Sequence, residues 1–239
     1  MKFKLFVFLI VINCYSIFSQ DSIPYFKQAI SVDFSKLWYL DSIYYEDSKQ
    51  YHYRPEPIGF IGNDYKRFQI HFNHVKKSES NPYEYAVNGK SKVKSNICNF
   101  NGLLKIMNVY LLKSTGLPYT MGTIQGNYLF SEDPKTEGSG LFKGNFITYW
   151  YYNKKKEIMY NALESAADGY CNNQFEGNWQ SYKSTVSKRC NWGDFRVPDC
   201  GDLDVGAGEF GINGKYKNNG WNDFQGSWND TVKHVEWWK

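Results

Sequence analysis

One short pattern occurs four times in the second half of this chain and limits what the chain can fold into. Each copy has an apolar residue, a spacer, a glycine, a small polar residue and an aromatic residue, at residues 124–128, 142–146, 175–179 and 224–228. Positions i, i+2 and i+4 all share one face of a strand, whereas in a helix position i+2 points away from the other two. Glycine between them permits a bulge, a sharp coil of the strand or the close approach of another backbone. The pattern therefore predicts a small, strongly curved antiparallel β protein.

Strand signals also precede the repeats. Residues 67–73 alternate between apolar and polar, as a half-buried strand does. Asn88-Gly89 favours a type I′ hairpin between two strand-like runs, because both positions tolerate positive φ. A second Asn-Gly pair, ending at Gly102, is expected to connect the next run. Three consecutive strands are therefore predicted as a meander.

The predicted fold class is all-β, an antiparallel meander closed into a barrel, with a β-sandwich as the alternative. Strands at this spacing are typical of both architectures, and closure would remove exposed sheet edges. The predicted organisation has four parts. They are a signal peptide at 1–19, an irregular lead-in at 20–57, the barrel at 58–183 and a loop-rich, Gly/Asp-rich extension packed on the barrel at 184–239.

The N-terminus has the pattern of an export signal. Lys2 and Lys4 precede a short apolar core at residues 5–12, and a plausible cleavage region follows at 16–20. Lipid attachment at Cys14 is the alternative, and only then would the protein be held at a membrane. The protein is expected to be exported, whether periplasmic, secreted or at the cell surface.

Charge argues against a nucleic-acid partner. Removing Lys2 and Lys4 from the 28 basic residues leaves 26 against 24 acidic ones. A nucleic-acid-binding domain would be expected to carry a clear basic excess.

Four cysteines follow the predicted signal, and an even number in an exported chain predicts disulfides. Pairing of Cys190 with Cys200 would close a loop rich in glycine, aspartate and proline. Pairing of Cys98 with Cys171 would join two distant strands. The other two connectivities remain open, and metal ligation is disfavoured because no Cys-x-x-Cys pair occurs.

The stretch at residues 190–210 concentrates carboxylates. Asp202-x-Asp204-x-Gly206 resembles the first half of an oxygen-ligand calcium loop, with Glu209 as a further candidate ligand that comes too early for an EF-hand. The simpler interpretation is that aspartates cap turns and that Arg196 pairs with one carboxylate. Two carboxylates of residues 194–209 could also act as acid and base in glycoside hydrolysis.

A small aromatic-lined barrel can hold one apolar or planar ligand. The candidate wall residues are Tyr128, Phe146, Trp150 and Trp179. The competing interpretation is that these rings form the packed core.

The Phe-x-Gly-Asn-aromatic strands resemble those of the calycin group, the lipocalins and avidins, over residues 59–183. This resemblance implies a calycin-like barrel and assigns no binding residue. The lipocalin Gly-x-Trp signature is not matched, because residues 36–39 read Lys-Leu-Trp-Tyr without the glycine. Residues 190–210 also resemble uncharacterised exported bacterial proteins, a resemblance that implies no known activity.

Together these patterns predict an exported, non-enzymatic β-barrel protein that binds a small molecule or a surface glycan. The first alternative is a cell-surface structural or interaction protein with a filled barrel. The second is a secreted hydrolase using the carboxylates of 194–209. The sequence leaves open the ligand, whether the barrel is hollow, the disulfide connectivity, lipidation at Cys14, the oligomeric state and any catalytic activity.

Overall fold

The computed structural model describes residues 22–113, 116–224, 226 and 236–239. The predicted signal peptide and Cys14 lie outside the described residues, as does most of the fourth repeat copy. Among the described residues, no helix has the length and apolar character needed to cross a membrane.

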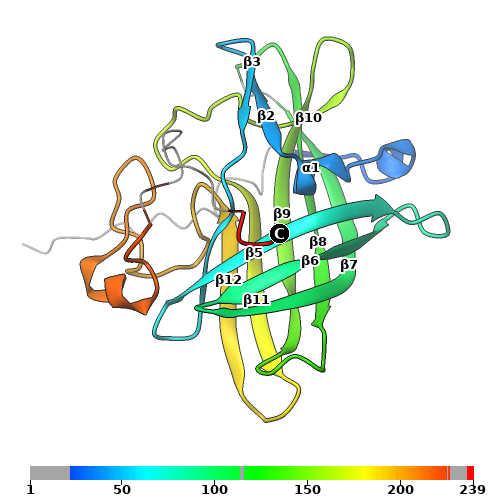
Figure 1. The fold of residues 1–239 in the computed structure, drawn as a ribbon. Coiled ribbons are helices and arrows are strands. Elements are labelled where there is room, and N and C mark those ends of the chain that lie inside the picture. The colour runs from blue at the N-terminus through cyan, green and yellow to red at the C-terminus, as the bar shows by residue number, and fades with distance from the viewer. Residues whose placement is uncertain (1–21, 114–115, 225, 227–235) are drawn as a thin grey trace, which may run out of the picture.

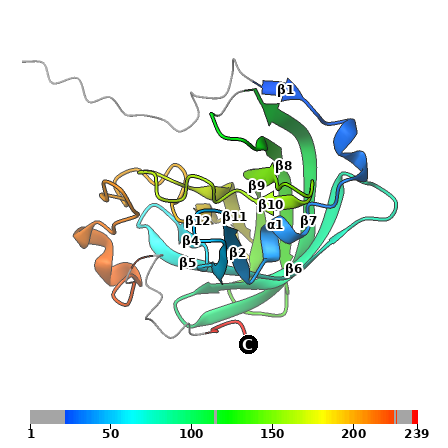
Figure 2. The same ribbon diagram turned by 90° about the horizontal axis from the view of Figure 1, so that it is seen from above.

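Eight antiparallel strands form a closed ring (Figures 1 and 2). In order around it they are β4 (Ile58–Ile61), β5 (Lys66–Lys77), β6 (Glu84–Val93), β7 (Asn96–Leu112), β8 (Thr120–Glu132), β9 (Gly140–Tyr152), β11 (Asn172–Ser181) and β12 (Ser187–Asp194). Pairing of β12 with β4 completes the ring. The all-β antiparallel meander predicted from the repeats is confirmed. Strand β12 continues the ring beyond residue 183, into the segment expected to be an extension.

The lead-in covers one end of the ring. It comprises β1 (Ser22–Pro24), the 3-10 helix η1 (Gln28–Ser31), the short helix α1 (Lys36–Tyr39) and the hairpin of β2 (Ser42–Tyr45) and β3 (Gln50–Tyr53). β1 pairs with β7, and β10 (Ile158–Tyr160) pairs with β9 near the same end. In the view from above, α1 lies over the ring opening (Figure 2). The C-terminal segment contains a second 3-10 helix, η2 (Gly214–Asn219).

The ring explains the glycine–aromatic repeat. The apolar, glycine and aromatic positions of each described copy face inward, and each glycine lies under a ring or backbone of the next strand. A Cβ on Gly126 would lie 2.6 Å from the Phe146 ring and 2.2 Å from the Lys105 carbonyl. Gly144 and Gly177 lie directly opposite each other. Gly177 is not among the glycines with positive φ, so close approach and not backbone conformation requires glycine there.

The predicted Asn-Gly hairpin is wrong. Asn88 and Gly89 lie inside β6, and the chain turns later, beside Lys94, whose φ is +55°. Gly102 likewise lies inside β7. Gly89 is needed because a Cβ there would lie 2.6 Å from the Phe100 ring and 2.2 Å from a carbonyl oxygen of β5. The requirement is again space under an inward-facing ring.

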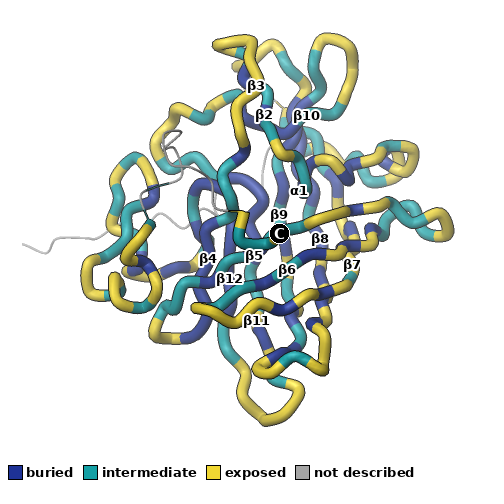
Figure 3. The backbone as a smooth tube through the Cα atoms, in the orientation of Figure 1, coloured by how far each residue is buried: buried dark blue, intermediate teal, exposed yellow. Residues whose placement is uncertain are grey.

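Two apolar cores lie on opposite faces of the sheet. The larger fills the ring and is mostly aromatic. The smaller packs Ile58 and Phe60 of β4 against Leu203, Phe210 and Trp221 of the C-terminal segment. Figure 3 shows buried positions alternating with exposed ones along the strands, and exposed loops at both ends. This alternation is expected for strands with one covered face.

Candidate functional site

Aromatic side chains fill the centre of the ring. Phe175 stacks on Trp192 with ring centroids 4.9 Å apart, and Tyr128 packs edge-on against both. The cavity at the covered end, beneath Arg54, has a volume of about 30 Å³. This space accommodates water, whereas a drug-sized ligand needs roughly 300 Å³ or more.

All four predicted wall residues belong to this packed core. Tyr128, Phe146, Trp150 and Trp179 are at most 8% exposed. Phe146 packs edge-on against Trp38 of the lead-in. The indole nitrogen of Trp179 donates a hydrogen bond to a buried carboxylate on β8. Their rings are occupied by packing, and among these four residues the Tyr128 hydroxyl and the Trp150 indole nitrogen have no hydrogen-bond partner in the described part of the chain.

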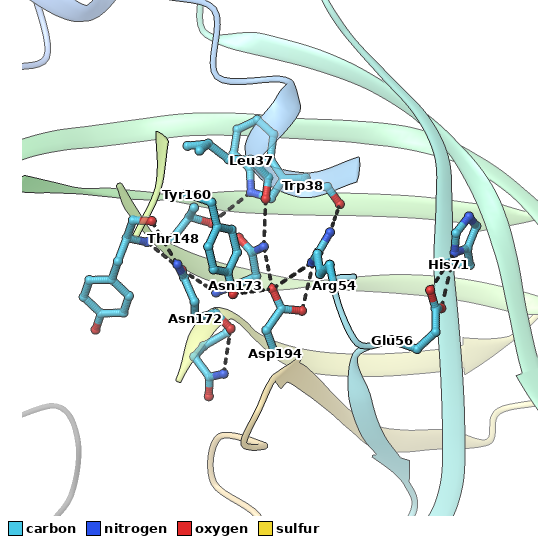
Figure 4. A network of polar contacts seen from close by, with 12 residues as sticks. Leu37, Trp38, Arg54, Glu56, His71, Thr148, Tyr160, Asn172, Asn173 and Asp194 are labelled. Carbon is cyan, nitrogen blue, oxygen red and sulfur yellow. Dashed lines mark hydrogen bonds and ion pairs between the residues drawn. The ribbon is translucent and has the colours of Figure 1, made fainter. Parts of the chain in front are cut away.

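A buried ion pair lies beside the small cavity (Figure 4). Arg54 follows β3, and Asp194 ends β12. Arg54 Nη2 lies 2.8 Å from both carboxylate oxygens of Asp194, and Arg54 Nη1 donates to the Trp38 carbonyl at 2.9 Å. The two side chains are 9% and 1% exposed. The pair therefore ties the lead-in to the ring in a nearly dry environment.

Neutral groups complete the coordination of Asp194 (Figure 4). Tyr160 Oη and Asn173 Nδ2 donate to Asp194 Oδ2 at 2.9 and 2.8 Å. Burial raises the pKa of Tyr160 well above its usual value, so its hydroxyl remains a donor. Asn173 also donates to the Leu37 carbonyl and accepts from Thr148. Every contact holds the fold together, and no polar atom of the pair is left to act on a ligand.

A second polar pair lies at the edge of the same cavity. His71 Nδ1 lies 3.0 Å from Glu56 Oε1, and the His71 ring stacks on Trp238 at 4.0 Å between centroids. The imidazole is thus covered by the C-terminal tail. One histidine with one carboxylate and a covered ring does not provide an open catalytic pair.

The carboxylates considered for hydrolysis are mostly paired with cations. Asp194 is bound by Arg54 and Asp199 by Arg189. Each arginine would have to be displaced before the carboxylate that it pairs with could serve as acid or base.

The predicted calcium ligands are also engaged elsewhere. Asp202 pairs with Lys215, and Asp204 pairs with Arg196 at 2.5 Å. Asp204 also accepts backbone N–H groups of its own loop, and Glu209 is exposed. Within the described ranges, no group of three or more His, Cys, Asp or Glu side chains is placed to hold a metal ion. Asp204 caps a turn here, whereas Asp202 accepts from the side chains of Lys215 and Tyr216.

Neither predicted disulfide is formed. Cys190 lies in the core inside the ring, whereas Cys200 lies in the smaller core outside it, so the sheet separates them. Cys98 is buried on β7 and Cys171 is partly buried just before β11. The disulfide prediction is corrected, and the export prediction now depends on the N-terminal segment alone.

The buried thiols should be unreactive in the folded protein. Burial, reinforced by Glu132, raises the pKa of Cys98 to about 12, and burial raises that of Cys200 to about 11. Because the thiolate is the nucleophile, iodoacetamide at pH 8 is expected to leave Cys98, Cys190 and Cys200 unmodified. Peptide mass mapping should show alkylation at all three only after unfolding in urea. Rapid labelling of the native protein, or a disulfide-linked peptide, would contradict this arrangement.

A broad hollow lies on the outer face of β8, β9, β11 and β12. Its volume is about 600 Å³, and it opens widely to solvent. Most of its lining residues carry polar side chains, and they are Asn127, Tyr128, Lys143, Gly144, Asn145, Glu176, Gly177, Asn178, Arg189, Asn191 and Asp199. Three repeat copies supply most of it, because their spacer and small polar positions face outward. Asn127 Nδ2 donates to Asn145 Oδ1 at 2.6 Å across β8 and β9.

Three polar atoms around this hollow are buried without a hydrogen-bond partner among the described residues. They are Tyr128 Oη, Glu176 Oε1 and Arg189 Nε. Burial, followed by the charge of Asp199, raises the pKa of Glu176, while Arg189 opposes the rise. Each unsatisfied group costs about 1–3 kcal/mol, and native proteins keep few of them. Three such atoms gathered at one hollow mark it as the candidate binding site.

Sequence reasoning identified Tyr128 here, but as part of an interior wall. It did not single out Glu176, Arg189 or the asparagines. A signal for Glu176, Asn127, Asn145 and Asn178 was present in the repeat itself, since its outward positions are polar in every copy that lines the hollow, whereas Arg189 lies outside the repeat.

Comparisons with known proteins identify no relative of this chain. No protein-family model matches the chain, and searches of curated proteins and of solved structures find no match.

Proposed function

We propose that this chain is an exported, non-enzymatic binding protein that holds a glycan on the outside of a filled ring. The observation that supports the proposal is the outer polar hollow, where three buried polar atoms lack partners. The alternative of an interior small-molecule site has little support, because the cavity at the covered end holds only about 30 Å³.

The chemistry of the lining favours a hydroxyl-rich ligand. Asparagine amides both donate and accept hydrogen bonds, and a carboxylate and a guanidinium add a charged acceptor and donor. Sugar hydroxyls also donate and accept, so each can be satisfied by such a surface. An apolar ligand would strip water from these groups and return no hydrogen bonds.

The test compares a panel of immobilised oligosaccharides with an apolar fluorescent probe, anilinonaphthalene sulfonate, on the purified mature chain. Saturable binding of at least one oligosaccharide, without stoichiometric binding of the apolar probe, is expected. Stoichiometric uptake of the apolar probe alone would favour an interior site. If neither an oligosaccharide nor the apolar probe binds, the alternative of a structural or interaction protein with a filled ring would be favoured.

A further inference from the structure

The strand register aligns the floor of the outer hollow. Tyr128 of β8 lies opposite Gly144 of β9, which lies opposite Gly177 of β11. A Cβ on Gly177 would lie 2.5 Å from Tyr128 Oη and 2.8 Å from the Gly144 Cα. The phenol hydroxyl therefore occupies the space that the missing side chain of Gly177 leaves. Tyr128 itself is 3% exposed and lines this floor, and its hydroxyl is buried there without a partner among the described residues.

The walls add an acceptor and a donor. Glu176, outward-facing on β11, keeps Oε1 unpaired, and Arg189 on β12 keeps Nε unpaired. The other guanidinium nitrogens of Arg189 are fixed, Nη1 by Asp199 at 2.9 Å and Nη2 by Tyr65 at 3.2 Å. These contacts hold Arg189 in place while leaving Nε to donate. The hollow thus offers a hydroxyl, a fixed donor and an acceptor together.

The charges of the hollow balance. Lys143 and Arg189 are positive, Glu176 and Asp199 are negative, and Arg189 with Asp199 already forms an ion pair. An anionic or a cationic ligand would meet as many like charges as opposite ones. The remaining lining is amide and glycine, which favours neutral hydroxyl groups.

We infer that this hollow binds a neutral saccharide, whose hydroxyls pair with Tyr128 Oη, Glu176 Oε1 and Arg189 Nε. The inference rests on the proposed function and adds to it the place, the three contacting atoms and the absence of ligand charge. Asn127 and Asn145, on the exposed side, would complete the contacts with further hydroxyls.

The probes are lactose, maltopentaose and chitotriose, with 3′-sialyllactose as the anionic counterpart of lactose. Titrations are followed by protein NMR shifts, which detect weak binding. At least one neutral saccharide is expected to shift the amide signals of Gly144, Asn145 and Gly177. Sialyllactose is expected to bind no more tightly than lactose. Tighter binding of sialyllactose would overturn the inference of a neutral ligand.

The first variant is Tyr128→Phe. It removes a buried hydroxyl that has no partner, so the melting temperature is expected to stay unchanged or rise. The Kd of the neutral saccharide is expected to rise by about 3–10-fold, the loss of one hydrogen bond. A structural role alone would lower the melting temperature without this selective loss.

Two further variants have matched controls at exposed residues of the same types. Glu176→Gln and Asn145→Ala are each expected to weaken binding by about 3–10-fold. Glu137→Gln and Asn99→Ala change exposed residues of the same types away from the hollow and should leave Kd unaltered. Binding that survives all three hollow variants would place the saccharide elsewhere and refute this inference while sparing the proposed function. Failure of every saccharide to bind would refute both.

Discussion

Replacing Arg54 with methionine is expected to lower the free energy of unfolding by about 3–5 kcal/mol. The substitution leaves the Asp194 carboxylate, 1% exposed, with only the neutral donors Tyr160 and Asn173. Methionine fills most of the volume but supplies neither charge nor the hydrogen bond to the Trp38 carbonyl. The lead-in would therefore lose its buried ion pair with the ring.

Urea unfolding followed by tryptophan fluorescence measures this loss. Lys76→Met is the control, because its pair with Glu79 is 66% and 88% exposed and is expected to contribute about 0–1 kcal/mol. The double variant Arg54→Met with Asp194→Leu should recover part of the loss, since no uncompensated charge remains. A single-variant loss below about 1 kcal/mol, the value of an exposed pair, would show that the network does not bear on stability.

Valine at Gly144 is expected to cost at least about 3 kcal/mol, the upper end for overpacking a core. A Cβ at this position would lie 1.9 Å from the Glu176 carbonyl oxygen and 2.7 Å from the Gly177 Cα. Neither backbone atom can move without separating β9 from β11, and that pairing is part of the ring closure. Partial or complete loss of the folded state is the expected result.

Far-UV circular dichroism and thermal melting follow this variant. Gly214→Ala is the matched control, because a Cβ there meets nothing within 4 Å and its φ is not positive. The control should change stability by no more than about 0.5 kcal/mol. A Gly144→Val protein that melts like the control would mean that the two strands are not as closely paired as the structure shows.

The candidate site was only partly foreseeable. The repeat marks which positions face outward, so the asparagines and Glu176 could have been grouped on one face from the sequence. Arg189 and Asp199 could not have been added, because they join the hollow only when β12 closes against β4 and β11. Nor could the sequence show that the Tyr128 hydroxyl is left without a partner.

Gly89 and two of the cysteines also show that local sequence does not reveal contacts with distant segments. Asn88-Gly89 has the composition of a turn, yet the need for space under Phe100 keeps Gly89 inside a strand. Cys190 and Cys200 are close enough in sequence to predict a disulfide, yet the sheet passes between them. In each case a contact with a distant segment outweighs the local preference.

The sequence by itself determined that this protein is a curved antiparallel meander, because a period of two residues and recurring glycines act within each strand. The tertiary structure alone decided that the ring is filled, that Arg54 meets Asp194 across 140 residues, and that the polar hollow lies outside. The physical reason is that strand faces are encoded locally, whereas closure of the ring sets which distant side chains share a space.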